Sequence, residues 1–194
     1  MLALDLDPNL SEYEMLEHKY SEKHRAYHNL THIKECLRHL DEYNQHLEDK
    51  REITLAIFYH DIVYNPYRKD NEQKSVDEAI RFLKSQEVEQ AIISKIEQLI
   101  LSTIHQNPPE TTAQSVLMDI DIAILGTRPS TYQEYSRNIR KEYSWVPIIL
   151  YKRKRKEILK SFLKRERLYY TDFFFKKFEA QARVNLQDEI NRLT

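Results

Sequence analysis

The chain has 194 residues, of which 41% are hydrophobic and 31% charged, and its formal net charge is -1. This length fits one domain with a substantial core, and the composition excludes a disordered chain and a polyelectrolyte that binds its partners through bulk charge. One glycine and six prolines are too few turn residues for a sandwich or a barrel. We therefore expect an all-α fold.

Helical spacing of apolar residues runs through almost the whole sequence, as in Ile92, Ile96, Leu99 and Ile100. In chain order, this spacing predicts nine helices: Leu10–Tyr20, Leu30–Leu47, Arg51–His60, Glu72–Lys84, Val88–His105, Ala113–Leu125, Tyr132–Tyr143, Ile148–Arg165 and Asp172–Arg192.

The breaks between these helices have local causes. They are turn or helix-stop sequences, namely Asn65-Pro66, Asn107-Pro108-Pro109, Gly126 with Pro129, and Pro147. None of them is typical of a domain linker, so we expect one helical domain over residues 1–194.

Cysteine content and hydropathy exclude two further classes. The only cysteine is Cys36, which rules out a disulfide within the chain and a Cys-based zinc cluster, so any metal must use His, Asp or Glu. No stretch approaches the roughly 20 apolar residues of a membrane span, and the acidic N-terminus is unlike a signal peptide. We expect no membrane partner and a cytoplasmic location.

The first group of candidate functional residues is a histidine series before and at the start of the second predicted helix. His28 and His32 are four residues apart and would share a face if the helix already runs there, and His24 extends the series. Because the chain has eight histidines, chance surface residues explain the spacing equally well.

The second group is the His60-Asp61 pair at the end of an apolar helix. His60 follows Ala56 and Ile57 by one turn, which places its imidazole on the buried face. Taken alone, a buried His beside an Asp is more often a satisfied structural pair than a pair of metal ligands.

The third group lies in Ser115–Leu125, where Asp119 and Asp121 are the only charges in an otherwise apolar helix. A carboxylate buried there costs several kcal/mol unless it is paired, hydrogen-bonded or bound to a cation. A cap, an arginine partner such as Arg140 and a protonated Asp are the alternatives, but two carboxylates suit a divalent ion better.

Together these groups resemble the HD superfamily of metal-dependent phosphohydrolases, whose signature is an early His, an adjacent His-Asp pair and a distant Asp, all on helices. The resemblance covers nearly the whole chain and extends to a bacterial branch described as predicted metal-dependent HD superfamily phosphohydrolases. The similar segments are Tyr27–Leu30, Phe58–Tyr64, Asn71-Glu72, Asp119–Gly126, Ile139–Tyr143, Glu179, Ala182-Arg183 and Asn185.

This resemblance implies a single-domain helical bundle of the HD type, with the metal-site core at about residues 20–126 and a helical C-terminal extension. It implies one divalent metal (Mn, Fe, Ni, Co, Zn or Mg) bound by His32, His60, Asp61 and Asp121, with Asp119 as the alternative to Asp121. Such an ion lowers the pKa of bound water for attack on phosphorus. The expected activity is hydrolysis of a phosphomonoester or phosphodiester, with a nucleotide as one candidate.

The same resemblance suggests roles for neighbouring residues. Asp61 would also orient the attacking water, Glu72 could carry a proton, and His28 or His105 could meet a leaving-group oxygen. Three basic residues could hold the phosphate of a small substrate, although surface ion pairs explain them equally well: Arg25, Arg140 and Lys141.

Two other readings compete with the enzyme. The first is a non-catalytic helical binding module that keeps the HD fold and a structural metal, which the thirteen Tyr and seven Phe support mildly. The second is nucleic-acid binding through the basic run Lys152–Lys156, but a solvated helix face explains that run better. We expect no nucleic-acid partner, and the sequence leaves homo-oligomerisation open.

Overall fold

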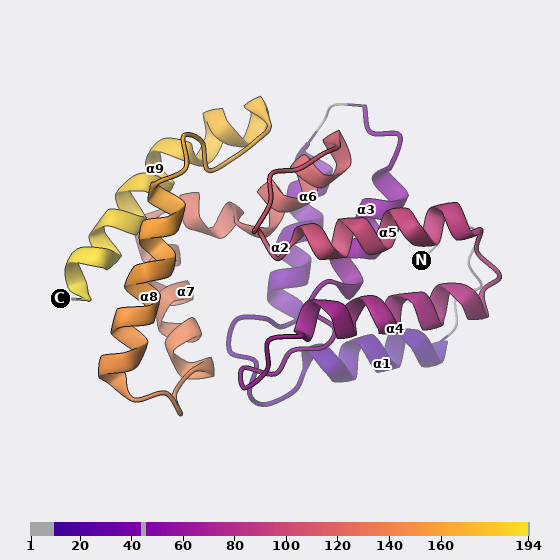
Figure 1. Ribbon diagram of the computed structural model, residues 1–194, viewed down its shortest axis with the longest axis horizontal. Helices are drawn as coiled ribbons and strands as arrows, with labels where there is room; N and C mark the ends of the chain where they lie inside the picture. The colour runs from indigo at the N-terminus through magenta and orange to yellow at the C-terminus, as the bar shows by residue number, and fades with distance from the viewer. Residues whose placement is uncertain (1–9, 44–45, 194) are drawn as a thin grey trace. The chain divides into compact units, whose positions relative to one another are not determined.

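A computed structural model describes residues 10–43 and 46–193, and over these residues the chain is helical, with no strand (Figure 1). The all-α prediction is therefore confirmed for the described residues. The elements are α1 (Leu10–Tyr20), α2 (Leu30–Glu42), α3 (Lys50–Tyr59), α4 (Asn71–Ser85), α5 (Gln90–Ser102), α6 (Thr112–Asp121), the 3-10 helix η2 (Ala123–Gly126), α7 (Pro129–Glu142), α8 (Ile148–Leu163) and α9 (Asp172–Arg192).

All nine predicted helices are present, and the largest differences are at two C-terminal ends. The helix predicted over Leu30–Leu47 ends at Glu42, and residues 44 and 45 of that prediction lie outside the described residues. The helix predicted over Ala113–Leu125 is in fact two elements, because α6 ends at Asp121 and η2 follows.

Side chains from the C-terminal part of the chain explain the break after α6. The Tyr169 hydroxyl donates to the carbonyl of Ile122, 3.1 Å away, and the Asn185 amide donates to the carbonyls of Leu125 and Thr127, both at 2.8 Å. These carbonyls are satisfied without the i→i+4 bonds of a longer α-helix, so the backbone is free to tighten into a 3-10 turn.

The chain divides into two compact units, one up to Met118 and the other from Asp119, with the boundary inside α6. In the first unit, α3 is central and packs against α2, α4 and α5, while α4 also packs against α5. Ile53, Ala56 and Ile57 of α3 are completely buried. This packing fixes the end of α3, where His60 and Asp61 follow.

In the second unit, α9 packs against η2 and α8, and α7 also packs against η2. Gly126, the only glycine in the chain, lies where η2 meets α9. A Cβ atom on Gly126 would overlap the Phe178 Cβ atom and would lie 2.7 Å from the Phe178 carbonyl oxygen. The sequence placed Gly126 in a helix stop, but its φ is not positive, and close helix approach is what requires glycine here.

We expect Gly126→Ala to lower the free energy of unfolding by about 1–3 kcal/mol, because the added methyl group meets backbone atoms that cannot rotate away. Chemical denaturation followed by circular dichroism measures this change. The control is Ser161→Ala, which changes an exposed residue and should change the free energy of unfolding by less than about 0.5 kcal/mol. Ala182→Gly in α9 would not serve as a control, because it removes buried contacts. If the Gly126→Ala variant is as stable as the wild type, η2 and α9 do not approach each other as closely as described.

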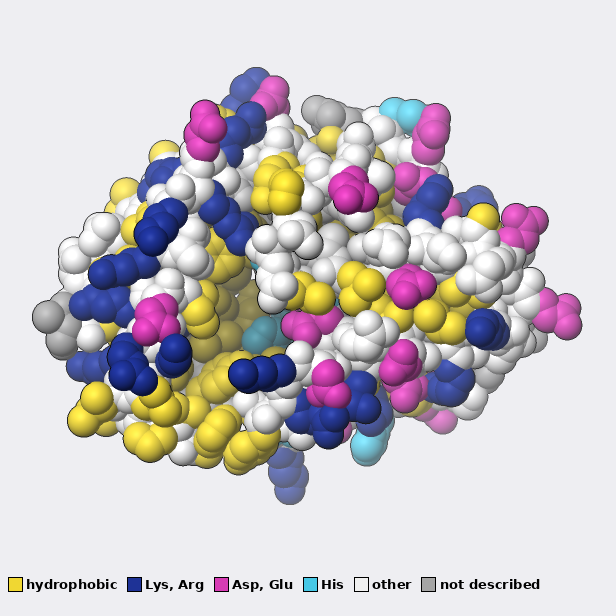
Figure 2. All heavy atoms as spheres, viewed as in Figure 1, with side chains coloured by type: hydrophobic (Ala, Val, Ile, Leu, Met, Phe, Trp, Pro, Cys, Tyr) yellow, Lys and Arg dark blue, Asp and Glu magenta, His cyan; other side chains and the backbone are white. Residues whose placement is uncertain are grey.

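The second unit also exposes several large hydrophobic side chains. They are Trp145, Ile148, Ile149, Leu150, Ile158 and Val184. Figure 2 shows hydrophobic side chains close to many Lys and Arg side chains in the part of the surface at the left of the view. Most of these exposed residues lie in or near the turn between α7 and α8.

Candidate metal centre

Three side-chain atoms of the first unit converge near the start of α2 and the end of α3. The His32 Nε2 and His60 Nε2 atoms are 3.2 Å apart, and the Asp61 Oδ2 atom lies 3.1 Å from His60 Nε2 and 3.7 Å from His32 Nε2. The two histidines are buried, whereas the Asp61 side chain keeps 19% of its surface exposed. The cluster is therefore enclosed but open to solvent at its carboxylate.

These separations fit the ligands of a divalent metal ion. Donor atoms bound to one ion at about 2.0–2.2 Å, with angles of roughly 90–110° between the bonds, lie roughly 3.0–3.5 Å apart. Two of the three distances fall in this range, and the third exceeds it by a small margin. Two imidazole nitrogens and a carboxylate oxygen suit Zn, Mn, Fe, Co or Ni.

The protonation of His60 also suits a ligand. Its Nδ1 atom is 2.9 Å from the Ile57 carbonyl oxygen. A carbonyl can only accept a hydrogen bond, so Nδ1 carries a proton, and once the other ring nitrogen has lost its proton the lone pair of Nε2 can bind a metal ion. A second hydrogen bond of this kind holds a metal-binding histidine in its orientation.

Asp61 is held in its charged form. Burial alone would raise the pKa of its carboxyl group, but positive charge on His60, His28 and His32 and the hydrogen bond with His60 outweigh burial, so the pKa lies well below its usual range. A carboxylate that stays ionised in a buried site is a strong ligand for a cation.

The structure also separates the two carboxylates of the third sequence motif. Asp121, the last residue of α6, is half-buried and belongs to the second unit. Asp119 is fully buried. Its two oxygens accept hydrogen bonds from the backbone N–H groups of Tyr170 and Thr171 and from the Thr171 hydroxyl, at 2.7–2.8 Å.

Asp119 therefore joins the start of α6's last turn to the segment before α9. Burial raises the pKa of the Asp119 carboxyl group to about 6. The three hydrogen bonds favour the charged form and lower the pKa, but burial outweighs them. Of the explanations considered for a buried carboxylate in this helix, hydrogen bonding is the one that applies to Asp119.

Arg25 donates hydrogen bonds to the backbone of the loop that contains Asp61. Its side chain is fully buried, and its Nη atoms donate to the carbonyls of His28, Asp61 and Ile62 at 2.7–3.1 Å, while Nε donates to Glu22 at 3.0 Å. The sequence suggested that Arg25 holds phosphate, but this burial gives it a structural role that fixes the backbone of Asp61.

The predicted histidine series does not lie on one helix. Asn29 caps α2, with its side-chain oxygen accepting from the Thr31 N–H group, so His24 and His28 precede the helix. His24 Nε2 lies 2.8 Å from the Tyr64 carbonyl oxygen, where it donates a hydrogen bond. His28 stacks on the Tyr64 ring at 4.3 Å and meets the His32 ring edge-on at 6.0 Å. The structure thus brings His28, but not His24, next to His32.

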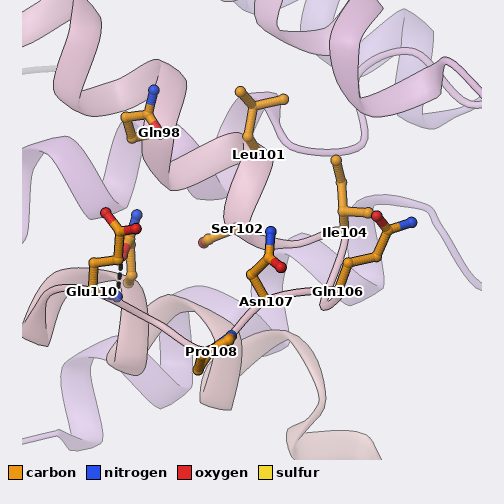
Figure 3. Close-up of a pocket in the computed structure, with 9 residues that line it drawn as sticks. Gln98, Leu101, Ser102, Ile104, Gln106, Asn107, Pro108 and Glu110 are labelled. Carbon is orange, nitrogen blue, oxygen red and sulfur yellow. Dashed lines mark hydrogen bonds between the residues drawn. The ribbon is translucent and has the colours of Figure 1, made fainter. Parts of the chain in front are cut away.

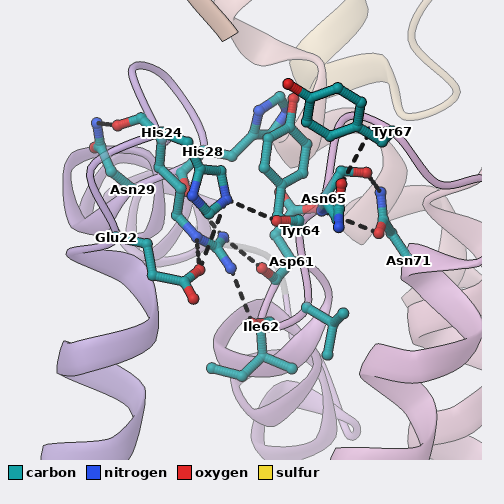
Figure 4. Close-up of polar contacts among 12 residues, drawn as sticks. Glu22, His24, His28, Asn29, Asp61, Ile62, Tyr64, Asn65, Tyr67 and Asn71 are labelled. Atoms are coloured by element: carbon teal, nitrogen blue, oxygen red, sulfur yellow. Dashed lines mark hydrogen bonds and ion pairs between the residues drawn. The ribbon is translucent and has the colours of Figure 1, made fainter.

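The loop after Asp61 is attached to the start of α4. The Asn71 side chain accepts from the Asn65 N–H group and donates to its carbonyl, both at 3.0 Å, as Figure 4 shows. The Ser75 hydroxyl accepts from the Val63 N–H group at 3.1 Å. Glu72, the predicted proton carrier, lies half-buried in the first turn of α4, and its role stays a prediction.

His105 lies in the turn after α5 and has a φ of 57°, a left-handed conformation in which histidine is enriched. A pocket of about 270 Å³ opens beside this turn (Figure 3). Its lining includes Gln98, Asn107 and Glu110 but no Lys or Arg. His105 itself does not line this pocket, so the pocket gives its proposed substrate role no support, and that role stays a prediction.

Arg140 and Lys141 belong to the second unit. The Arg140 guanidinium donates to the carbonyls of Tyr143 (2.5 Å) and Val146 (3.1 Å) and lies over the Tyr151 ring. Lys141 donates to the Asn138 side chain at 3.0 Å. Arg140 therefore shapes the turn between α7 and α8, and phosphate binding by either residue stays a prediction.

Cys36 is a neighbour of the cluster that the sequence analysis did not predict. The Cys36 sulfur lies 3.7 Å from Nε2 and 3.8 Å from Nδ1 of His32, and the thiol is buried. The signal was available, because residues four apart on α2 share a face, but Cys36 was considered only as part of a disulfide or a cysteine cluster.

Comparisons with known proteins add no family to this geometry. No protein-family model matches the chain, and neither the curated proteins nor the solved structures contain a match.

Proposed function

We propose that this chain is a metal-dependent phosphohydrolase that cleaves a small phosphate ester. The observation that carries the proposal is the convergence of His32 Nε2, His60 Nε2 and Asp61 Oδ2 at separations of 3.1–3.7 Å. The resemblance to the HD superfamily adds the phosphate ester as substrate and Asp121 as the fourth ligand. A nucleotide is one candidate substrate.

In this proposal, His32, His60, Asp61 and Asp121 hold one divalent ion. When bound, such an ion neutralises charge on phosphoryl oxygens and makes water a better nucleophile at neutral pH. Side chains of the protein position the attacking water and the leaving group. The Asp61 carboxylate, kept ionised and partly exposed, accepts a hydrogen bond from the attacking water and orients it toward phosphorus.

Other residues keep this arrangement in place. Ile57 holds the ring orientation of His60 through Nδ1, and Arg25 holds the backbone of Asp61. His28, stacked on Tyr64 beside His32, is close enough to the cluster to donate a proton to a leaving-group oxygen. Fixed groups of this kind hold reactants in position without further reorganisation.

A screen of phosphate monoesters and diesters, each tested with Mn, Fe, Ni, Co, Zn and Mg, tests the proposed function. We expect hydrolysis of at least one ester that depends on added metal and is removed by a chelator. His60→Ala should lose this activity, and His46→Ala, which changes an exposed histidine, should keep it. Equal hydrolysis by the His60→Ala protein would contradict the proposal.

The two carboxylates of α6 should behave differently when each is changed to an amide. They are two residues apart, or about 200° around the helix axis, so both cannot face one ion. We expect Asp121→Asn to weaken metal binding by roughly 100-fold or more. Asp119→Asn should weaken it by about 10-fold at most but lower the free energy of unfolding by about 1–3 kcal/mol, because an amide N–H group would face N–H donors.

Metal titration and thermal melting of both variants separate these effects. If Asp119→Asn loses the metal and Asp121→Asn keeps it, the ligand assignment on α6 is wrong. If both bind metal as the wild type does, the fourth ligand comes from elsewhere.

A further inference from the structure

The turn between α7 and α8 presents a group of large apolar side chains to solvent. Trp145 is 47% exposed, and in the first turn of α8 Ile148 is 51%, Ile149 83% and Leu150 40% exposed. We call these four residues the apolar tip. Isolated exposed hydrophobic residues are common on protein surfaces, whereas a contiguous group of this kind marks an interaction site.

The apolar tip is built on a fixed backbone. Arg140 donates to the carbonyls of Tyr143 and Val146 on the two sides of Trp145, and its guanidinium lies 4.7 Å from the centre of the Tyr151 ring. Tyr151, Arg155 and Leu159 form the buried face of α8. Since Ile149 and Leu150 lie on the other side of the helix, burying them requires a partner outside this unit.

Basic side chains surround the apolar tip. Between residues 137 and 156 the only acidic residue is Glu142, and it is buried; the next residue, Glu157, is exposed and pairs with Lys154 at 2.8 Å. The basic side chains exposed in the same stretch are Arg137, Lys141, Arg153 and Lys154, and Lys152 and Lys156 are half-buried. Figure 2 shows this mixture of Lys, Arg and hydrophobic side chains at the left of the view.

We propose that the apolar tip and its basic surround bind the surface of an anionic lipid bilayer. A helix end with Trp and aliphatic side chains buries them at the boundary between headgroups and acyl chains, while nearby Lys and Arg bind anionic headgroups. The basic surround favours this partner over a second copy of the chain, because two copies would bring like charges together. Exposed aliphatic residues favour a bilayer over a nucleic acid, which offers them no apolar surface.

This binding requires no helix that crosses the membrane, and among the described residues no helix is long and apolar enough to do so. It revises the expectation of no membrane partner, which considered spans and signal peptides alone. The proposal is independent of the hydrolase activity.

Trp145 offers a direct test, because it is the only tryptophan in the chain. The full chain is mixed with phosphatidylcholine vesicles that contain phosphatidylserine, and with vesicles of phosphatidylcholine alone. We expect co-sedimentation with the anionic vesicles, a shift of the Trp145 emission to shorter wavelength, and loss of both at high salt.

Three variants locate the contact. Ile149→Glu should lower the affinity for anionic vesicles roughly 10- to 100-fold, and the double variant Arg153→Gln/Lys154→Gln roughly 10- to 30-fold. Val184→Glu is the matched control, since Val184 is an exposed apolar residue of α9 (53%), and it should change the affinity by about twofold at most. Circular dichroism confirms that each variant is folded.

Four results would overturn the proposal. They are absence of binding to anionic vesicles, equal binding to neutral vesicles, an equal loss in Val184→Glu, and a concentration-dependent shift of Trp145 emission without vesicles that Ile149→Glu removes. The last result would show that a second copy covers the apolar tip. A chain that binds no vesicles could still bind duplex DNA or RNA tightly. If Ile149→Glu leaves that binding unchanged, the basic surround is a nucleic-acid site instead.

Discussion

Asp61→Ala is expected to reduce metal-dependent phosphate-ester hydrolysis by roughly 100- to 10,000-fold, the range in which a positioned acid or base contributes. The change removes both a ligand and the carboxylate that orients water. Because the Asp61 side chain is partly exposed and its backbone is held by Arg25, the helices should remain folded. Steady-state kinetics at saturating metal measure the loss, and far-UV circular dichroism checks the fold.

Asp41→Ala is the matched control for this experiment. Asp41 lies on α2, its side chain is 76% exposed, and it makes an ion pair with Lys50 at the surface, which contributes little to stability. Its activity should equal that of the wild type. Full activity in the purified Asp61→Ala protein would show that Asp61 has no part in the reaction.

Glu189→Ala is expected to lower the free energy of unfolding by about 3–5 kcal/mol, the cost of leaving a buried charge without its partner. Glu189 on α9 accepts two hydrogen bonds from Arg155 on α8, at 2.9 and 3.2 Å, and one from the Tyr132 hydroxyl on α7, at 2.5 Å. All three side chains are buried. Urea denaturation of the full chain measures the effect.

The double variant Arg155→Met/Glu189→Leu is the control for this ion pair. Replacing both charges by apolar groups removes the unpaired charge, so its stability should recover toward the wild-type value. Glu189→Ala with wild-type stability would contradict the account.

The pH dependence of stability gives a second check on Glu189. Burial opposes ionisation, but the hydrogen bond and charge of Arg155 lower the pKa of Glu189 below its usual value. A carboxyl group with a lower pKa in the folded state stabilises the protein above its ordinary pKa and loses that contribution as the pH falls through the folded value. Glu189→Gln should therefore weaken the acid sensitivity of the second unit.

Helices were the part of the fold that the sequence predicted best, because apolar spacing and the Pro and Asn breaks are local signals. The two ends of α9 were predicted correctly from such signals. The end of α6 was not, because it depends on Tyr169 and Asn185, which are more than 45 residues away in sequence. Periodicity along one segment carries no information about such partners.

In the candidate site, too, some features were predicted from the sequence, and others depend on partners that are distant in sequence. The resemblance to the HD superfamily proposed His32, His60 and Asp61 as neighbours, whereas each motif alone left a structural role open, and the structure places their side chains together. For Arg25 the sequence left phosphate binding and a surface ion pair open, because its burial depends on three carbonyls of the folded chain. The role of Asp119 likewise depended on Thr171, a partner that no spacing rule indicates.

Metal binding by His32, His60 and Asp61 is the central claim, and metal titration of the purified chain tests it most directly. Protein freed of metal by a chelator is titrated with Mn, Co, Ni and Zn in a calorimeter, and the bound metal is counted by elemental analysis, for the wild type and for His60→Ala. The account predicts that the wild type binds one equivalent of at least one of these ions and that His60→Ala binds it roughly 100-fold more weakly or not at all. A wild-type chain that binds none of them, or a His60→Ala chain that binds the ion as tightly as the wild type, would contradict it.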